Sequence, residues 1–89
     1  MKVAYQASPQ QKKAARAKAV ERIIVEVDGI PLDGDEESQG RITRAALALN
    51  TEESTQWMCA DNQPRLVTKE QFVRALRLAG EEQTRLWFL

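Results

Sequence analysis

Apolar residues recur at spacings of three and four along the last part of the chain, from Val67 to Leu89. This spacing predicts an amphipathic helix, because such positions fall on the same helical face. Thr68 and Gln71 are placed as in a capping box, so we expect the helix to begin at Thr68. Gly80 interrupts the pattern, which suggests that another backbone passes close to it. The expected inner face consists of Phe72, Ala75, Leu76, Ala79, Gln83 and Leu86.

Two pairs of short apolar runs, each joined by turn-forming residues, predict two β-hairpins. In the first, residues 23–27 and 30–32 flank Asp28-Gly29, which favours a type I′ turn because both turn positions need positive φ. In the second, residues 55–60 and 65–67 flank an Asp-Asn-Gln-Pro sequence. A single antiparallel sheet covered by two helices is the simplest way to bury these runs together.

Two further helices are expected upstream of the last one. Ser8-Pro9 has the residues of an N-cap and first turn, followed by a basic, alanine-rich stretch to about residue 23. This stretch has little to bury, so we expect it to be a solvated or connecting helix, or to pack on a partner. Asp35 is expected to cap a second helix that ends near Asn50, a residue that tolerates left-handed backbone.

These elements together predict an α+β fold. A leading helix is followed by two β-hairpin-plus-helix units, with a small antiparallel sheet covered by helices. We expect residues 1–22 to form a basic N-terminal arm and helix, and residues 23–89 to form a single small α+β domain.

The residue types present exclude most common catalytic sites. The 89 residues contain no histidine and one cysteine, Cys59, so they can form neither an intramolecular disulfide nor a thiol–imidazole pair. The neighbours of Cys59 supply no base, which favours a structural role. Asp33-Gly34-Asp35 lacks the ligand spacing of a calcium loop. We therefore expect a protein that is not an enzyme, with no catalytic, metal or cofactor-binding residue and no cofactor.

Charge is segregated along a chain whose net charge is zero. Residues 1–22 contain six basic residues and one acid, a net charge of +5, whereas residues 23–53 contain two basic residues and eight acids, a net charge of −6. Pairing within the molecule or between subunits is the simplest account. Nucleic acid is not the expected partner, because no aromatic residues are interleaved with the basic ones. No apolar run or signal-peptide core indicates a membrane, so we expect the cytoplasm.

The final residues, Leu86-Trp87-Phe88-Leu89, are too many large apolar side chains to face one small core together. Either the last turn folds back onto the core, or these residues present an apolar patch to another chain. The candidate partner-binding residues are therefore Trp87, Phe88 and Leu89, with Lys12, Lys13 and Arg16 of the basic helix. A homo-oligomer is one of the partners that this patch allows.

Three segments between about residues 23 and 87 resemble a small family of unknown function found in bacteriophage and prophage tail-region proteins. They are D-G-D-E-E-S-Q-G-R-I-T-R-A-A-L-A-L, T-Q-W-M-C-A-D-N and V-T-K-E-Q-F. In that family a similar domain forms the C-terminal part of proteins encoded near tail fibre genes. No functional residue of the family can be carried over to this chain.

The resemblance implies a non-enzymatic tail-associated protein whose partner is a phage tail or fibre protein. It would be a small virion component or an adaptor bound to a tail fibre or baseplate, present in the host cytoplasm during assembly and then in the virion. One alternative is a tail or fibre assembly chaperone that is absent from the virion. A further alternative is a phage regulatory protein that binds nucleic acid through the basic N-terminal helix.

Overall fold

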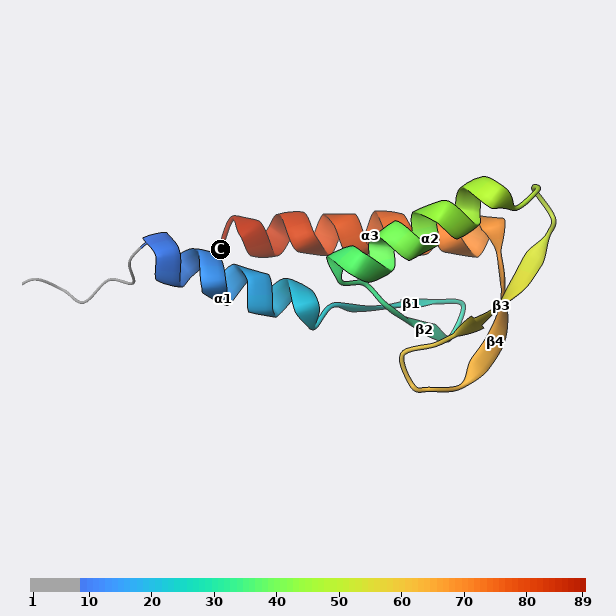
Figure 1. Ribbon diagram of the computed structural model, residues 1–89, viewed down its shortest axis with the longest axis horizontal. Helices are drawn as coiled ribbons and strands as arrows, with labels where there is room; N and C mark the ends of the chain where they lie inside the picture. The colour runs from blue at the N-terminus through green and yellow to red at the C-terminus, as the bar shows by residue number, and fades with distance from the viewer. Residues whose placement is uncertain (1–8) are drawn as a thin grey trace, which may run out of the picture.

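The computed structural model describes residues 9–89, which form three helices and four strands (Figure 1). Their order is α1 (Pro9–Glu21), β1 (Ile24–Val27), β2 (Ile30–Asp33), α2 (Glu36–Ala48), β3 (Ser54–Met58), β4 (Pro64–Thr68) and α3 (Lys69–Trp87). This order confirms the predicted α+β fold, with a leading helix and two units of a hairpin followed by a helix.

The first hairpin has the predicted turn. Strands β1 and β2 pair antiparallel, with Val27 opposite Ile30, and Asp28-Gly29 closes the turn. Asp28 has a φ of 51° and Gly29 a φ of 78°, the left-handed backbone that a type I′ turn requires. The local sequence is therefore sufficient to fix this turn.

The left-handed backbone expected at Asn50 is not present. Helix α2 ends instead at Ala48, and the backbone of its C-cap, Leu49, is extended, with φ −86° and ψ 144°. Asn62, in the turn of the second hairpin, is the asparagine that has a positive φ, of 64°. Asparagine does adopt left-handed backbone in this chain, but it does so in the turn between β3 and β4 and not at the end of α2.

The two hairpins form two separate two-stranded sheets, and not the single sheet that would have been the simplest way to bury them together. Pro31 in β2 has no amide hydrogen to donate, which prevents a continuous ladder along that strand. The Pro31 carbonyl oxygen accepts a hydrogen bond of 2.9 Å from the amide of Ala60, just beyond β3. The hairpins are thus joined by a local contact and not by strand pairing.

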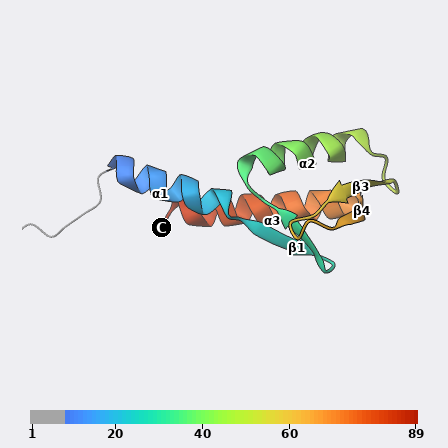
Figure 2. The ribbon, with the colours of Figure 1, turned by 60° about the horizontal axis from the view of Figure 1, so that its bottom comes forward.

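Helix α3 is the element around which the others are arranged. Helix α2 lies along its first half and α1 beside its second half, while β1 packs on it from the side opposite α2 (Figures 1 and 2). The C-terminus consequently lies beside α1 (Figure 2). None of the helices in the described part of the chain is long and apolar enough to cross a membrane.

The core consists of two clusters that meet at Trp57 and Ile30. One cluster contains Val20, Ile23, Val25, Val27, Leu32, Cys59, Ala75 and Ala79, and the other contains Ile42, Ala46, Val67 and Phe72. The rings of Trp57 and Phe72 meet edge to face, with centroids 4.8 Å apart. The predicted inner face of α3 is confirmed: Phe72, Ala75 and Ala79 are buried, and Leu76, Gln83 and Leu86 are half-buried.

The leading helix packs on its own chain. Val20, near the end of α1, is 4% exposed and belongs to the same cluster as Ile23. Helix α1 also contacts α3. The proposed boundary between residues 22 and 23 therefore falls between two side chains of one core cluster, and α1 is neither fully solvated nor dependent on a partner.

The glycine that permits a close approach is Gly34, not Gly80. A Cβ atom built at Gly34 would lie 2.6 Å from Cγ2 of the buried Ile23 and 3.1 Å from Cβ of Ala79. A Cβ at Gly80 would meet no atom within 4 Å. The expectation for Gly80 was wrong, because the side of α3 on which it lies is open at that point.

The same substitution at these two glycines should have opposite effects. Gly34→Ala should lower the free energy of unfolding by about 1–3 kcal/mol, because Ile23 and Ala79 would have to move. Gly80→Ala should raise it by about 0.5–1 kcal/mol, because alanine favours the helix and meets no obstacle. Urea unfolding of both variants measures the two changes. A destabilised Gly80→Ala variant would contradict the open surface seen there.

Candidate partner-binding site

The apolar end of α3 is largely exposed. Trp87 ends the helix and is 40% exposed, and the following Phe88 and Leu89 are 82% and 77% exposed. Leu86, by contrast, is half-buried and packs against the first core cluster. The last turn therefore does not fold Phe88 and Leu89 back onto the core. Whether these two side chains contact another chain stays a prediction.

The predicted basic residues lie on two sides of α1. The Arg16 guanidinium lies over the Trp87 ring, 5.6 Å from its centroid, a distance that allows a cation–π interaction. Lys12 and Lys13 are exposed. A shallow groove between α1 and α3 is lined by Lys12, Ala15, Arg16, Ala19, Leu86 and Leu89. The structure thus brings Arg16 to Trp87 and Lys12 to the groove that contains Leu89, while Lys13 lies outside it.

Two adjoining depressions meet at Trp87 and Glu36, and we call them together the Trp87 groove. The first lies between α1, the start of α2 and the end of α3, and is lined by Ala17, Val20, Glu21, Asp35, Glu36, Glu37 and Trp87. The second runs along α3 and is lined by Glu36, Gly80, Gln83, Thr84, Trp87 and Phe88. The Trp87 groove therefore combines apolar surface with four carboxylates.

Sequence reasoning did not predict this acidic border. It expected Asp35 to cap α2, and Asp35 does cap the helix and accepts a hydrogen bond of 3.3 Å from the Ser38 amide, with Glu36 and Glu37 in the first turn. Burial opposes ionisation of Asp35, but the hydrogen bonds from Ser38 outweigh it and lower its pKa. The carboxylate is thus charged near neutral pH. The same residues that start the helix give the groove its negative charge.

A chain of amide side chains positions the start of α2 against α3. The Gln39 amide nitrogen donates to the Gly34 carbonyl at 2.9 Å and to the Gln83 side-chain oxygen at 2.8 Å. The Gln83 amide nitrogen donates in turn to the Glu36 carboxylate at 2.7 Å. The Gln39–Gln83 and Gln83–Glu36 bonds link residues 44 and 47 positions apart and hold Glu36 at the border of the groove.

In the described residues, ion pairs within the chain do not join the basic helix α1 to the acidic segment that follows it. Among the residues whose side chains are described, no lysine or arginine of α1 forms an ion pair with an acid of residues 23–53. The ion pairs that the structure contains lie within α2 and α3, within the second hairpin, and between the first hairpin and α3. The basic face of α1 and the acidic border of the groove thus both remain exposed.

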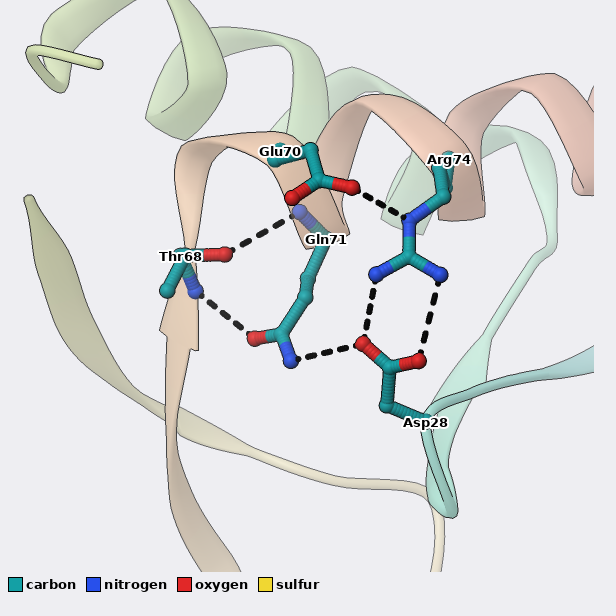
Figure 3. A network of polar contacts seen from close by, with 5 residues as sticks. All are labelled: Asp28, Thr68, Glu70, Gln71 and Arg74. Atoms are coloured by element: carbon teal, nitrogen blue, oxygen red, sulfur yellow. Dashed lines mark hydrogen bonds and ion pairs between the residues drawn. The ribbon is translucent and has the colours of Figure 1, made fainter. Parts of the chain in front are cut away.

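The most extensive polar network lies at the other end of α3 (Figure 3). Thr68 and Gln71 form the predicted capping box, and the Gln71 side chain also donates to Asp28 at 3.1 Å. Arg74 donates two hydrogen bonds to the Asp28 carboxylate and pairs with Glu70 at 3.0 Å. The bonds from Arg74 lower the pKa of Asp28. This arrangement ties the first hairpin to α3 and keeps Asp28 ionised, which does not suit an acid–base catalyst.

Cys59 has a cationic neighbour that sequence reasoning missed. The pKa of Arg65 is raised, first by the Asp61 carboxylate and second by the Cys59 sulfur. Cys59 is nevertheless only 2% exposed, and Arg65 donates two hydrogen bonds, of 2.9 and 2.7 Å, to Asp61. The cysteine therefore packs in the core. Across residues 9–89, no group of three or more carboxylate or thiol side chains is placed to hold a metal ion.

The model of one protein family matches almost all of the described structure. It is a domain of unknown function, DUF4376, and the match covers residues 6–87. The chain belongs to the DUF4376 family. No curated protein and no solved structure matches it. The match shows that α1 is part of the DUF4376 domain, together with both hairpins and their helices.

The Asp61–Arg65 pair predicts how acid affects this DUF4376 domain. Hydrogen bonds from Arg65 are the main reason that the Asp61 pKa falls from 3.8 to about 2. Since the folded pKa is the lower one, the pair stabilises the fold above pH 3.8, and this contribution is lost as pH falls towards 2. Thermal unfolding should show a smaller acid-induced fall in Tm for Asp61→Asn and for Arg65→Gln. An unchanged fall in both variants would contradict the pairing.

Replacing a buried and an exposed phenylalanine of this region by alanine should change the free energy of unfolding by very different amounts. Phe72→Ala removes a fully buried ring and should lower the free energy of unfolding by about 3–5 kcal/mol. Phe88→Ala removes an 82% exposed ring and should change it by less than about 0.5 kcal/mol. Chemical denaturation of the two variants makes the comparison. A large loss in Phe88→Ala would place that ring in the core after all.

Proposed function

We propose that this DUF4376 domain is a non-enzymatic, tail-associated bacteriophage protein that binds a fibre or baseplate protein. The observation that carries the proposal is the exposed apolar end of α3, where Phe88 and Leu89 are 82% and 77% exposed and Leu89 lines a groove with residues of the basic helix α1. Phe88 is the C-cap of α3 and Leu89 follows it, so the end of the helix presents two large apolar side chains at the surface. They are therefore suitable anchors for an interface.

The non-enzymatic part of the proposal follows from the charged groups. The carboxyl pKa values that shift, at Asp28, Asp35, Asp61 and Glu82, are all lowered. A general acid or base that works near neutral pH needs a shift in the opposite direction. No charged residue is buried among residues 12–89. These groups have the properties of surface ion pairs and helix caps.

The tail setting is supported by the resemblance of residues 23–87 to domains of phage tail-region proteins. An adaptor in such a setting needs an exposed surface and a stable fold, but no reactive group. The end of α3 supplies the exposed surface, and the two core clusters supply the stable fold.

Mass spectrometry of purified particles from a phage that encodes the chain tests the proposal. We expect the protein to be present in the particles and to be lost from them when Phe88 and Leu89 are both changed to alanine. Leu47→Ala is the matched control, because Leu47 is 78% exposed on α2 but lies away from the end of α3. That variant should remain in the particles.

Other outcomes identify the alternatives. A protein that is absent from particles, but whose deletion yields particles without fibres, would be an assembly chaperone. Salt-sensitive DNA binding that is lost when Lys12, Lys13, Arg16 and Lys18 are neutralised would indicate a regulatory protein. Particles that neither contain the protein nor change when it is deleted would overturn the tail setting.

A further inference from the structure

We propose that the Trp87 groove and the outer face of α1 form one self-complementary surface, through which two copies of this chain associate about a two-fold axis. In this arrangement α1 of one copy lies antiparallel to α1 of the other. The inference rests on charge and geometry in the chain itself. It does not depend on the tail setting proposed above.

The outer face of α1 has opposite charges at its two ends. Lys13, Ala17 and Glu21 are spaced four residues apart, so they lie along one side of the helix, and all three are exposed. Ala17 and Glu21 also line the Trp87 groove. This face thus has a cation on one side of a small residue and an anion on the other.

Antiparallel pairing about Ala17 matches these charges, whereas parallel pairing does not. With Ala17 of each copy at the centre, Lys13 of one copy faces Glu21 of the second copy, and the two-fold axis repeats the contact. The alanine side chains allow the helices to approach closely. In a parallel pair, lysine would face lysine and glutamate would face glutamate. The charge pattern therefore favours a closed dimer.

The rest of the Trp87 groove is also complementary in charge to α1 of the second copy. Asp35, Glu36 and Glu37 border it next to Glu21, so the basic first half of the second copy's α1 would pass over four carboxylates. Among the residues whose side chains are described, none of these four acids forms an ion pair with a lysine or arginine of α1. The same carboxylates would repel a nucleic acid. A basic, alanine-rich helix fits this surface, and the chain has one.

Trp87, the last residue of α3, lies where such a dimer would cover it, whereas Leu89 lines the separate groove that contains Lys12 and Arg16. In both views of the ribbon the C-terminus is beside α1 and not at the far end of the molecule (Figures 1 and 2). Trp87 forms part of the groove, and Phe88 extends it along α3. Charge pairs would set the orientation of the two copies, and burial of Trp87 and of the alanine side chains of α1 would supply most of the affinity.

Light scattering across a concentration series, with variants that reverse one or both charges, tests the dimer. The wild type should change from monomer to dimer as concentration rises, and high salt should weaken the dimer. Lys13→Glu and Glu21→Lys should each raise the dimer dissociation constant by roughly tenfold or more, because each change places like charges together at two symmetric contacts. The variant with both changes should recover the wild-type constant, because the pairs re-form with the charges exchanged.

Arg44→Glu is the control for net charge, since it makes the same charge change on an exposed face of α2. It should leave the dissociation constant unchanged. A wild type that stays monomeric at every concentration would overturn the proposal, as would a doubly changed variant no better than the single ones. Equal weakening by Arg44→Glu would show a net-charge effect, and assemblies larger than a dimer would exclude the two-fold arrangement.

Discussion

A two-stranded hairpin cannot bury an apolar face by itself, and this chain has two hairpins where a larger sheet was expected. The inward side chains of the strands must therefore be covered by a helix, and α3 contacts β1, β4, α1 and α2. Phe72 and Ala75 have no exposed surface, and they belong to the two different core clusters. Because the inner face of α3 is used in this way, only its outer side and its end remain for contacts with other molecules.

The features that could be predicted from the sequence depend on residues close together in the chain. Asp28-Gly29 needs only its own backbone preference to form the hairpin turn. Thr68 and Gln71 form the capping box with each other's side chains and amides, three positions apart. The inner face of α3 follows from the helical repeat alone. For these elements, the local chemistry and the final packing agree, which is a general property of sequences that fold to one structure.

The features that could not be predicted depend on residues far apart in the chain. The close approach at Gly34 exists because Ala79 of α3 lies beside the end of β2. The Gln39–Gln83 bond joins α2 to α3 across 44 positions. Helical spacing also leaves choices open: both Glu81 and Glu82 lie within one turn of Arg85, and Arg85 pairs with Glu82 while Glu81 pairs with Arg77. No periodicity in the sequence distinguishes these outcomes.

Charge segregation links the fold to the candidate site. Once α1 packs on α3 through Val20, the basic segment cannot extend away from the acidic start of α2, yet no direct ion pair joins the two in the described residues. Exposed ion pairs contribute little to stability, so their absence within the chain costs little. Unpaired charges of both signs on one surface nevertheless select what can bind there, because they attract a complementary pattern and repel others. The charges around Trp87 therefore contribute little to folding, and recognition is the role that we propose for them.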